Sequence, residues 1–250
     1  MGSSDPRWGP LDRALESSLR ARVDPDHPPV VLFSGGVDSA LLAWELRAVE
    51  GASLLTVGVA GSDDLEQASR VAPRFGLPWA GHVLEDAELT VVERTARPEL
   101  VGVPGPRRGI FVALAAGFAS APPGPILCGQ GIDELFFGYA HYRGLPIEAA
   151  HARSSVDLER LVEHDWPRTG RIAALWGREM AAPYLDPAFV EAAEQVPVAD
   201  RLPGTLGKEF FRRWATHRGL AEDLTQRPKR ALQYGSGIDR WLRRQSEEGH

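Results

Sequence analysis

Short apolar runs alternate with amphipathic segments through the first half of the chain. The run at residues 30–33 is apolar at every position, which is typical of a strand buried on both faces of a parallel sheet. Similar runs recur, separated by segments with helical spacing. The predicted strands cover residues 30–33, 54–59, 79–84 and 126–128, and the predicted helices cover residues 38–49, 63–75 and 110–119. Repeated strand–helix–strand units predict an α/β fold with a doubly wound parallel sheet and right-handed crossovers.

The second half of the chain changes to helical spacing, and no strand pattern is visible in it. Proline and glycine separate the helical segments, which are predicted at residues 156–166, 171–180, 187–195 and 208–218. The Pro- and Gly-rich loops at residues 104–106 and 122–125 are too short to separate two domains. We therefore predict one domain over residues 1–250, with an α/β core over residues 25–140 and a mainly helical C-terminal cap over residues 150–250.

Composition excludes several classes of protein. The chain of 250 residues has 43% hydrophobic and 25% charged residues, with no apolar run long enough to cross a membrane and no apolar signal-peptide segment at its N-terminus. Its net charge of -6 argues against nucleic acid as a partner. Cys128 is the single cysteine, so an intramolecular disulfide and a paired-cysteine metal site are excluded. We therefore expect a cytoplasmic protein with neither a membrane nor a nucleic-acid partner.

Basic residues in this chain are almost all arginine. Lysine occurs only as Lys208 and Lys229, and asparagine is absent. A residue type that is retained against such a bias is a candidate for a chemical requirement. Arginine cannot replace lysine where a compact ammonium must reach a phosphate as a point charge. Both lysines are therefore candidates for contacts with phosphate.

The segment SGGVDS follows the first apolar run and opens the first predicted helix. Gly35 and Gly36 allow backbone N–H groups to converge on an anion, and the helix adds its positive N-terminal end. Ser34 and Ser39 can donate hydroxyl hydrogen bonds to phosphate oxygens. Asp38 would repel a bare phosphate, so its presence favours a bridging Mg²⁺. The alternative is a tight strand–helix turn in which Asp38 caps the helix.

SGGVDS after an apolar strand resembles the PP-loop of N-type ATP pyrophosphatases. This superfamily includes GMP, NAD, argininosuccinate and asparagine synthetases and tRNA-thiolating enzymes, which cleave ATP between the α and β phosphates and form an adenylate. The segment is not a Walker loop, and the pair Gly207–Lys208 is followed by Glu209 and lacks an upstream glycine at the required spacing. The resemblance implies ATP and Mg²⁺ as cofactors and an adenine nucleotide alpha hydrolase-like fold, with residues 25–140 binding the nucleotide.

Further segments narrow the resemblance to the synthetase half of asparagine synthetases. CGQGIDELFFGY at residues 128–139 is similar to that family's second signature, and PYLD at residues 183–186 is similar to its PFLD segment. Three other similar segments are VGVAGSDDL at 57–65, KEFFR at 208–212, and RPK at 227–229 with YGSG at 234–237. The last of these also resembles a loop of β-lactam synthetases. The matches occur in the family's order, so together they are specific although each later one is weak alone.

The resemblance implies a role for each site residue. Asp38 and Asp133, both at the carboxyl ends of strands, would hold Mg²⁺ on the departing pyrophosphate; the alternative for Asp133 is simply a favourable helix N-terminus. Lys229 would lie over the α-phosphate and offset the charge that builds during attack, the alternative being a solvated basic loop. Lys208 would bind phosphate or cap a helix. The nucleotide-binding set is Phe33, Ser34, Gly35, Gly36, Asp38, Ser39, Val57, Cys128, Gly129 and Lys208.

Three features depart from the family pattern. Gln130, expected among the catalytic residues, stands where many members have Glu; it can form hydrogen bonds but cannot act as a base. Ala181 replaces an arginine that would suit a substrate carboxylate. The glutaminase domain that precedes this one in the family is missing, so ammonia is expected from solution or a separate glutaminase subunit. Outside the motifs, Arg107 and Arg108 precede a predicted helix and are expected to form a solvated turn, the alternative being contact with substrate.

The expected function is an ATP-dependent, AMP-forming ligase that joins a small-molecule carboxylic acid to ammonia or another amine. Aspartate with ammonia is the simplest pair, and a specialised metabolite of the β-lactam synthetase type is the variant. Two alternatives remain open: another PP-loop enzyme, and a nucleotide-binding partner subunit without catalysis. The sequence also leaves a homodimer open.

Overall fold

The computed structural model describes residues 5–202, 204–227 and 232–248, and it contains a five-stranded parallel sheet. The strand order is β3-β2-β1-β4-β5, and every neighbouring pair is parallel. The strands are β1 (Val30–Leu32), β2 (Ser53–Gly58), β3 (Trp79–Val83), β4 (Ile126–Leu127) and β5 (Met180–Ala181). The parallel α/β prediction is confirmed. Because β2 and β3 lie on one side of β1 and β4 lies on the other, the chain reverses its direction of progression between β1 and β4, which is where such sheets bind ligands.

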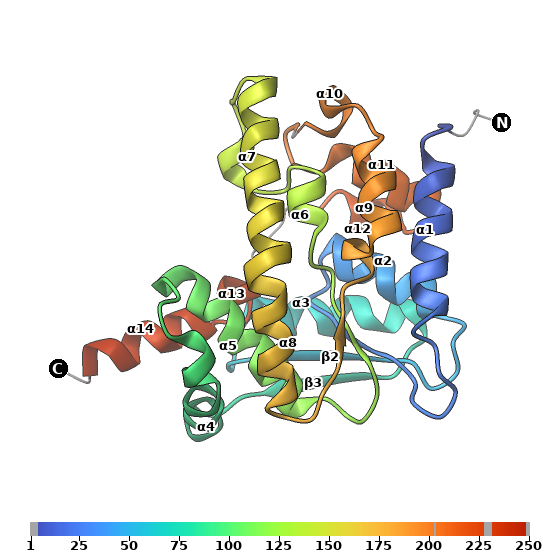
Figure 1. The fold of residues 1–250 in the computed structure, drawn as a ribbon. Helices are drawn as coiled ribbons and strands as arrows, with labels where there is room; N and C mark the ends of the chain where they lie inside the picture. Colours follow the sequence, from blue (N-terminus) through green and yellow to red (C-terminus); the bar gives the residue numbers. More distant parts are fainter. Residues whose placement is uncertain (1–4, 203, 228–231, 249–250) are drawn as a thin grey trace.

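Helices cover both faces of this sheet (Figure 1). Alternating strand residues supply the two cores: Val31 and Phe33 face one helical layer, whereas Val30 and Leu55 face the other. The first layer contains α1 (Trp8–Arg20), α2 (Val37–Leu46), α3 (Asp63–Val71), α9 (Pro187–Glu194) and α11 (Glu209–His217). The second contains α4 (Asp86–Ala96), α5 (Gly105–Ser120), α8 (Trp166–Ala174) and α14 (Ile238–Glu248).

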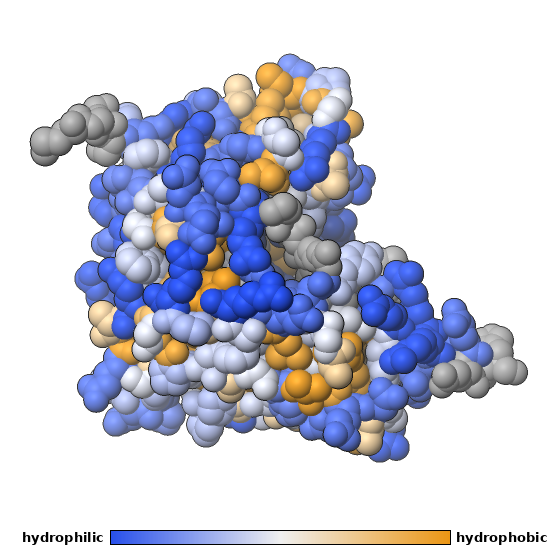
Figure 2. Space-filling model, turned by 180° about the vertical axis from the view of Figure 1, so that it is seen from behind, coloured by the Kyte–Doolittle hydropathy of each residue, from blue (hydrophilic) through white to orange (hydrophobic). Residues whose placement is uncertain are grey.

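Shorter elements connect these layers and form the cap. They are η1 (Ala72–Phe75), η2 (Arg97–Leu100), α6 (Ile132–Leu135), η3 (Ala140–Tyr142), α7 (Ile147–Arg160), η4 (Leu161–Asp165), η5 (Pro183–Leu185), α10 (Val198–Arg201), α12 (Glu222–Thr225) and α13 (Leu232–Gly235). The second half is mainly helical, as predicted. None of the described helices has the length and apolar character that a bilayer crossing requires. On the face seen from behind, most side chains are hydrophilic (Figure 2).

The prediction that the second half contains no strand is wrong. Met180 and Ala181 form β5, which pairs with β4 at the sheet edge. The predicted helix at residues 171–180 ends at Ala174 instead, and Gly177 follows with a φ of +62° that continues no helix. A strand of two residues has no alternation of apolar and polar positions, so periodicity could not reveal it.

The predicted helix at residues 156–166 is part of a longer rod. Helices α7 and α8 are joined without interruption by η4, a single π-helical segment, and the three elements form one column beside the sheet (Figure 1). The Pro104–Pro106 loop is also shorter than predicted, because α5 already begins at Gly105. Proline is tolerated in a first helical turn, where its missing N–H has no helical partner.

Candidate active site

A cavity of about 360 Å³ opens at the carboxyl edge of the sheet, where the strand order reverses. The residues that follow β1 and β4 both line it, as expected for a switch-point crevice. Among the predicted nucleotide-binding residues on its wall are Phe33, Ser34, Ser39, Val57, Cys128 and Gly129. Three chain segments that are separate in sequence therefore meet around one space.

The loop between β1 and α2 is held by hydrogen bonds between its own serines and backbone. The N–H of Ser34 donates to Oγ of Ser39 over 3.3 Å, and that hydroxyl donates to the carbonyl of Gly36 over 3.2 Å. Gly35 adopts a φ of +72°, which favours glycine. The loop thus presents a helix N-terminus, two hydroxyls and the carboxylate of Asp38 at the edge of the cavity, which suits a phosphate.

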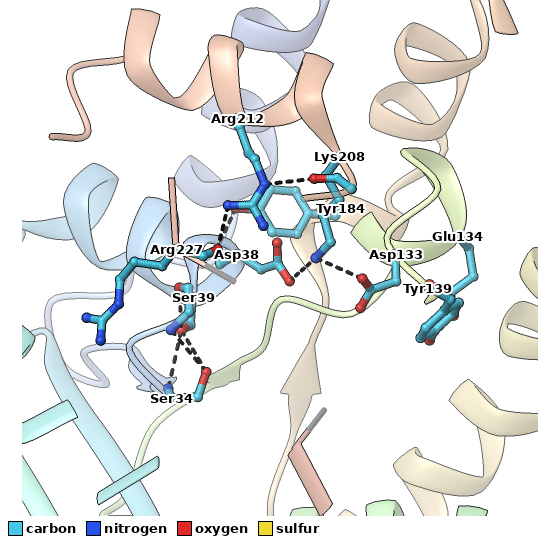
Figure 3. A network of polar contacts seen from close by, with 12 residues as sticks. Ser34, Asp38, Ser39, Asp133, Glu134, Tyr139, Tyr184, Lys208, Arg212 and Arg227 are labelled. Carbon is cyan, nitrogen blue, oxygen red and sulfur yellow. Dashed lines mark hydrogen bonds and ion pairs between the residues drawn. The ribbon is translucent and has the colours of Figure 1, made fainter. Parts of the chain in front are cut away.

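Lys208 brings the two predicted metal ligands together. Its ammonium nitrogen lies 2.6 Å from Oδ2 of Asp38 and 2.8 Å from Oδ1 of Asp133, and the three side chains point toward one another (Figure 3). Only 1% of Lys208 is exposed. Burial acts to lower the pKa of Lys208, but the attraction of Asp133 and Asp38 outweighs it and raises that pKa above its ordinary value. Lys208 is therefore a buried cation between two carboxylates.

The backbone around this ion triad is strained. Phe137 and Lys208 are the two non-glycine residues with positive φ in the described part of the chain, at 54° and 60°. Gly138 directly follows Phe137, and a Cβ atom added to it would collide with both Asp133 and Lys208. Such conformations cost about 1–3 kcal/mol each and persist where surrounding contacts impose them, most often at functional sites.

The two carboxylates fit a magnesium ion that is shared with a phosphate. Oδ1 of Asp38 is buried and has no hydrogen-bond partner among the described residues. Within the same residues there is no group of three or more His, Cys, Asp or Glu side chains that could hold a metal by itself. Mg²⁺ is commonly held by one or two carboxylates together with substrate phosphates, so the donor set suits Mg–nucleotide better than a resident metal.

Two other predicted residues also face the cavity. Gln130 lines it, and its Oε1 atom is buried without a hydrogen-bond partner in the described structure. Cys128 is buried, and burial raises the pKa of its thiol to about 12. A thiol that stays protonated is a poor nucleophile, so Cys128 acts as a wall residue.

Lys229, the predicted catalytic lysine, lies outside the described residues. The chain that leads toward it is anchored by Arg212, whose Nη1 donates to the carbonyl of Arg227 over 2.9 Å. Arg212 also donates through Nε to Gly207, the residue before Lys208. The segment before Lys229 is thereby tied to the backbone that carries the buried lysine. A second hollow beside the SGGVDS loop is lined by Lys208, Arg212 and Arg227.

The expectation for Arg107 and Arg108 is wrong, because neither forms a solvated turn. Both lie in the first turns of α5; Arg107 pairs with Asp165, and Arg108 pairs with Glu93. Arg107 also lines the cavity. A helix that leads into a parallel strand must begin at the carboxyl edge of the sheet, and this topological rule was the signal that could have placed Arg107 at the site.

Sequence reasoning did not single out Asp64, a buried acid at the cavity, and left the role of its neighbour in the cavity wall, Glu134, open between metal binding and a helix N-terminus. Asp64, in the first turn of α3, is 7% exposed, and burial raises its pKa to about 7. Glu134 is buried and accepts a hydrogen bond of 2.7 Å from the hydroxyl of Tyr139. Asp64 and Tyr139 belong to the two segments that carried the family resemblance, so their positions beside the site could have been inferred from those segments.

Comparisons with known proteins show what the chain is similar to. Residues 10–152 and 146–248 match a family model described as asparagine synthase. A glutamine-hydrolysing asparagine synthetase of Asparagus officinalis is 27% identical over 229 residues, which cover 85% of this chain and 38% of the relative. Asparagine synthetase B of Escherichia coli K12, also glutamine-hydrolysing, is 25% identical over 226 residues, which cover 78% of this chain and 38% of the relative.

The match to these relatives is partial in length. The chain spans 34% to 50% of the first curated relatives. Among solved structures, the NH3-dependent NAD synthetase from Campylobacter jejuni is 14% identical with a TM-score of 0.37, covering 76% of this chain and 93% of that one. A TM-score this low carries no argument about fold or activity.

Proposed function

We propose, since the chain belongs to the asparagine synthase family, that it is an ATP-dependent ligase that adenylates a carboxylic acid and transfers the acyl group to ammonia or another amine. The observation that carries the proposal is the meeting of Asp38, Asp133 and Lys208 at the carboxyl edge of the sheet, beside the SGGVDS loop. A cation, two carboxylates and a phosphate-binding loop at one edge of the sheet suit a nucleoside triphosphate with Mg²⁺.

The nucleotide would be held by residues of four segments. Backbone N–H groups of the SGGVDS loop and the hydroxyls of Ser34 and Ser39 bind phosphate oxygens, and Lys208 contributes charge. Asp38 and Asp133 would hold Mg²⁺ on the departing phosphates. The ion, when bound, neutralises charge that develops on the leaving pyrophosphate. Phe33, Val57, Cys128 and Gly129, which line the cavity, would shape the nucleotide pocket.

Adenylation needs the acid and the α-phosphate to meet in the cavity. A carboxylate oxygen of the acid attacks the α-phosphorus, the bond from that phosphorus to the bridging oxygen breaks, and pyrophosphate leaves with the electron pair. Lys229 would lie over the α-phosphate and offset the charge that grows there. The product is a mixed anhydride of the acid and AMP.

Amide formation follows when an amine attacks the carbonyl carbon of this anhydride and AMP leaves. The buried Oε1 of Gln130 can accept a hydrogen bond from the N–H of the amine and so orient its lone pair. An amide side chain cannot take the released proton. The proton therefore passes to water or to a phosphate oxygen of the departing AMP. Aspartate with ammonia is the simplest substrate pair.

Exchange of radiolabelled pyrophosphate into ATP tests the proposal directly. Exchange is expected only when Mg²⁺ and a suitable carboxylic acid are both present, because the acyl-adenylate must form and reverse. Incubation with ATP and Mg²⁺ but no acid is the matched control. If ATP binds but no acid across a broad panel supports exchange, the ligase proposal fails and a nucleotide-binding subunit without catalysis becomes the better account.

A further inference from the structure

A groove of about 630 Å³ lies between α4, the first turn of α5 and α14, and it shares no lining residue with the active-site cavity. Helix α14 runs outward from the body of the protein beside α5 (Figure 1). We call this hollow the α14 groove; its charged lining residues are Glu93, Arg97, Arg108, Asp239 and Arg243. The proposed adenylation step involves none of them.

Three guanidinium groups in the α14 groove share two carboxylates. Nη2 of Arg97 donates to Oε2 of Glu93 over 2.7 Å, and Nη2 of Arg108 donates to Oε1 of the same carboxylate. Arg243 donates to Oδ2 of Asp239. The side chains of Glu93 and Asp239 are 9% and 8% exposed, whereas those of Arg97 and Arg243 are 63% and 67% exposed. The carboxylates are therefore covered, and the excess positive charge faces the solvent.

These arginines keep N–H donors for a ligand. In the described part of the chain, the side-chain hydrogen bonds of Arg108 and Arg243 use Nη2, which leaves Nε and Nη1 to donate elsewhere. Burial acts to raise the pKa of Glu93, but hydrogen bonds from Arg97 and Arg108 outweigh it and lower that pKa below its ordinary value. Glu93 thus stays ionised and holds two guanidiniums together, an arrangement that suits an oxyanion.

The first turn of α5 adds the positive end of a helix to the groove. This helix of 16 residues has no acidic residue in its first turn, and no side chain of the described structure caps its N-terminus. Gly105, its first residue, lines the groove, and a Cβ atom added there would meet no other atom within 4 Å. Open space therefore lies beside an uncapped helix N-terminus, which favours an oxyanion such as phosphate.

One wall of the α14 groove is apolar. Trp241 and the partly buried Leu242 both line it. Trp241 is 2% exposed, and its Nε1 atom is buried without a hydrogen-bond partner among the described residues. A buried N–H without a partner costs free energy, so this wall lacks an acceptor. The volume of the groove is in the range of small-molecule sites, and its lining suits an organic group attached to the oxyanion better than a bare ion.

We propose that the α14 groove is a second ligand site, which binds a small phosphate monoester and fastens α14 onto α4 and α5. The phosphate lies between Arg97, Arg108 and Arg243, near the N-terminus of α5. The organic group lies against Trp241 and Leu242. This site does not depend on the proposed ligase activity, because it uses none of the residues assigned to that reaction.

The groove is connected to the active site through two elements. Arg107 lines the active-site cavity and Arg108 lines the groove, although they are consecutive residues of the first turns of α5. The segment that leads into α14 is also tied to the sheet edge, because the carbonyl of Ser236 accepts a hydrogen bond of 2.9 Å from the N–H of Val59. A ligand in the groove therefore contacts elements that also border the active site, which is the position expected of a regulatory site.

Calorimetric titration of phenyl phosphate tests the site. The protein is first saturated with Mg²⁺ and a non-hydrolysable ATP analogue, so that the SGGVDS loop is occupied, and sodium chloride keeps the ionic strength constant. Phenyl phosphate is expected to bind about 10-fold more tightly than inorganic phosphate, because its ring is buried against the apolar wall. Equal affinity for the two probes overturns the monoester assignment, and absence of binding refutes the site.

Paired variants assign the binding to the groove. Arg243→Gln is expected to weaken phenyl phosphate binding by about 10- to 100-fold, the range for one charge-assisted hydrogen bond. Arg244→Gln is the matched control, because Arg244 is exposed on the same helix and is not among the described residues that line the groove. Arg97→Gln and the exposed control Arg94→Gln form the same pair on α4.

Equal weakening within each pair would mean that net charge alone attracts the probe, and it would overturn the site. The comparison within a pair is informative whether or not the ATP analogue binds. Failure of the ligase proposal therefore leaves this test intact, and failure of the groove leaves the ligase proposal intact.

Hydrogen exchange tests whether the ligand fastens α14. The backbone amides of α14 are expected to exchange about 10-fold more slowly with saturating phenyl phosphate, because Arg243 is then connected through the ligand to α4 and α5. Arg243→Gln should lose this added protection, whereas Arg244→Gln should keep it. Binding of phenyl phosphate without slower exchange in α14 would overturn the fastening role.

Discussion

The ammonium of Lys208 lies 2.6 Å from Oδ2 of Asp38, a residue 170 positions earlier in the chain. The same ammonium contacts Asp133 over 2.8 Å. A single buried cation thus pairs with both proposed metal ligands. Mg²⁺ must share or displace this ammonium, which favours binding of the ion together with the phosphates rather than before them.

Replacement of Lys208 tests this relationship. Lys208→Met is expected to lower the free energy of unfolding by about 3–5 kcal/mol without Mg²⁺, because two partly buried carboxylates lose their cation. Added Mg²⁺ should restore part of that loss and stabilise the variant more than the wild type. Urea unfolding with and without Mg²⁺ measures both effects. Arg213→Met, an exposed change on the same helix, is the control, and equal stabilisation of variant and wild type by Mg²⁺ would contradict the prediction.

Gly138 is predicted to tolerate no side chain. In Gly138→Ala, the added methyl group must displace Asp133, Lys208 or both, so stability should fall by about 1–3 kcal/mol and pyrophosphate exchange should be lost. Gly170→Ala is the matched control, since Gly170 is an exposed helical residue whose added Cβ would meet no neighbour, and it should stabilise the protein by about 0.5–1 kcal/mol. Thermal melting and exchange assays compare the two, and normal exchange in Gly138→Ala would show that the triad geometry is not required.

Asp64 is predicted to make stability depend on pH. Its pKa is about 7 in the folded protein, against an ordinary value of 3.8, so the folded state binds an extra proton between these pH values. Stability from this group is therefore greatest below pH 4 and is lost as pH rises to 7, by roughly 4 kcal/mol at most, with no further change above.

Asp64→Asn should remove this dependence. The difference in unfolding free energy between variant and wild type is expected to grow in favour of the variant from pH 4 to pH 7. Asp63→Asn, an exposed carboxylate in the same first turn, should show no such trend. Urea titrations at several pH values provide the measurement, and parallel curves for Asp64→Asn and wild type would refute a protonated Asp64.

Lys229 is predicted to act in catalysis rather than in nucleotide binding. Lys229→Arg should abolish turnover while the affinity for ATP changes little, because a planar guanidinium cannot place a compact charge over the α-phosphate. Single-turnover formation of AMP and calorimetric titration of ATP measure the two quantities separately. Normal turnover in this variant would remove Lys229 from the mechanism.

Local patterns were sufficient for much of the fold. The apolar run at residues 30–33 and the apolar runs that follow it predicted the parallel sheet, because a strand buried on both faces is apolar at nearly every position. β5 was missed because a strand of two residues is too short to show an alternation of apolar and polar positions. It is a strand only because it pairs with β4. The π turn η4 was missed for a similar reason, since a helix of any kind shows the same amphipathic spacing over a few residues.

The candidate site also has features that the sequence predicted and features that only the structure shows. By itself, the sequence determined the SGGVDS loop and the position of Asp133 at a strand end, because a strand, a glycine turn and a helix start are encoded within a few neighbouring residues. Only the tertiary structure decided that Lys208 lies between Asp38 and Asp133, and that Arg107 lines the cavity with Arg160. Such pairings depend on how the helical cap packs onto the sheet edge, and periodicity along the chain contains no information about the distance between side chains so far apart in sequence.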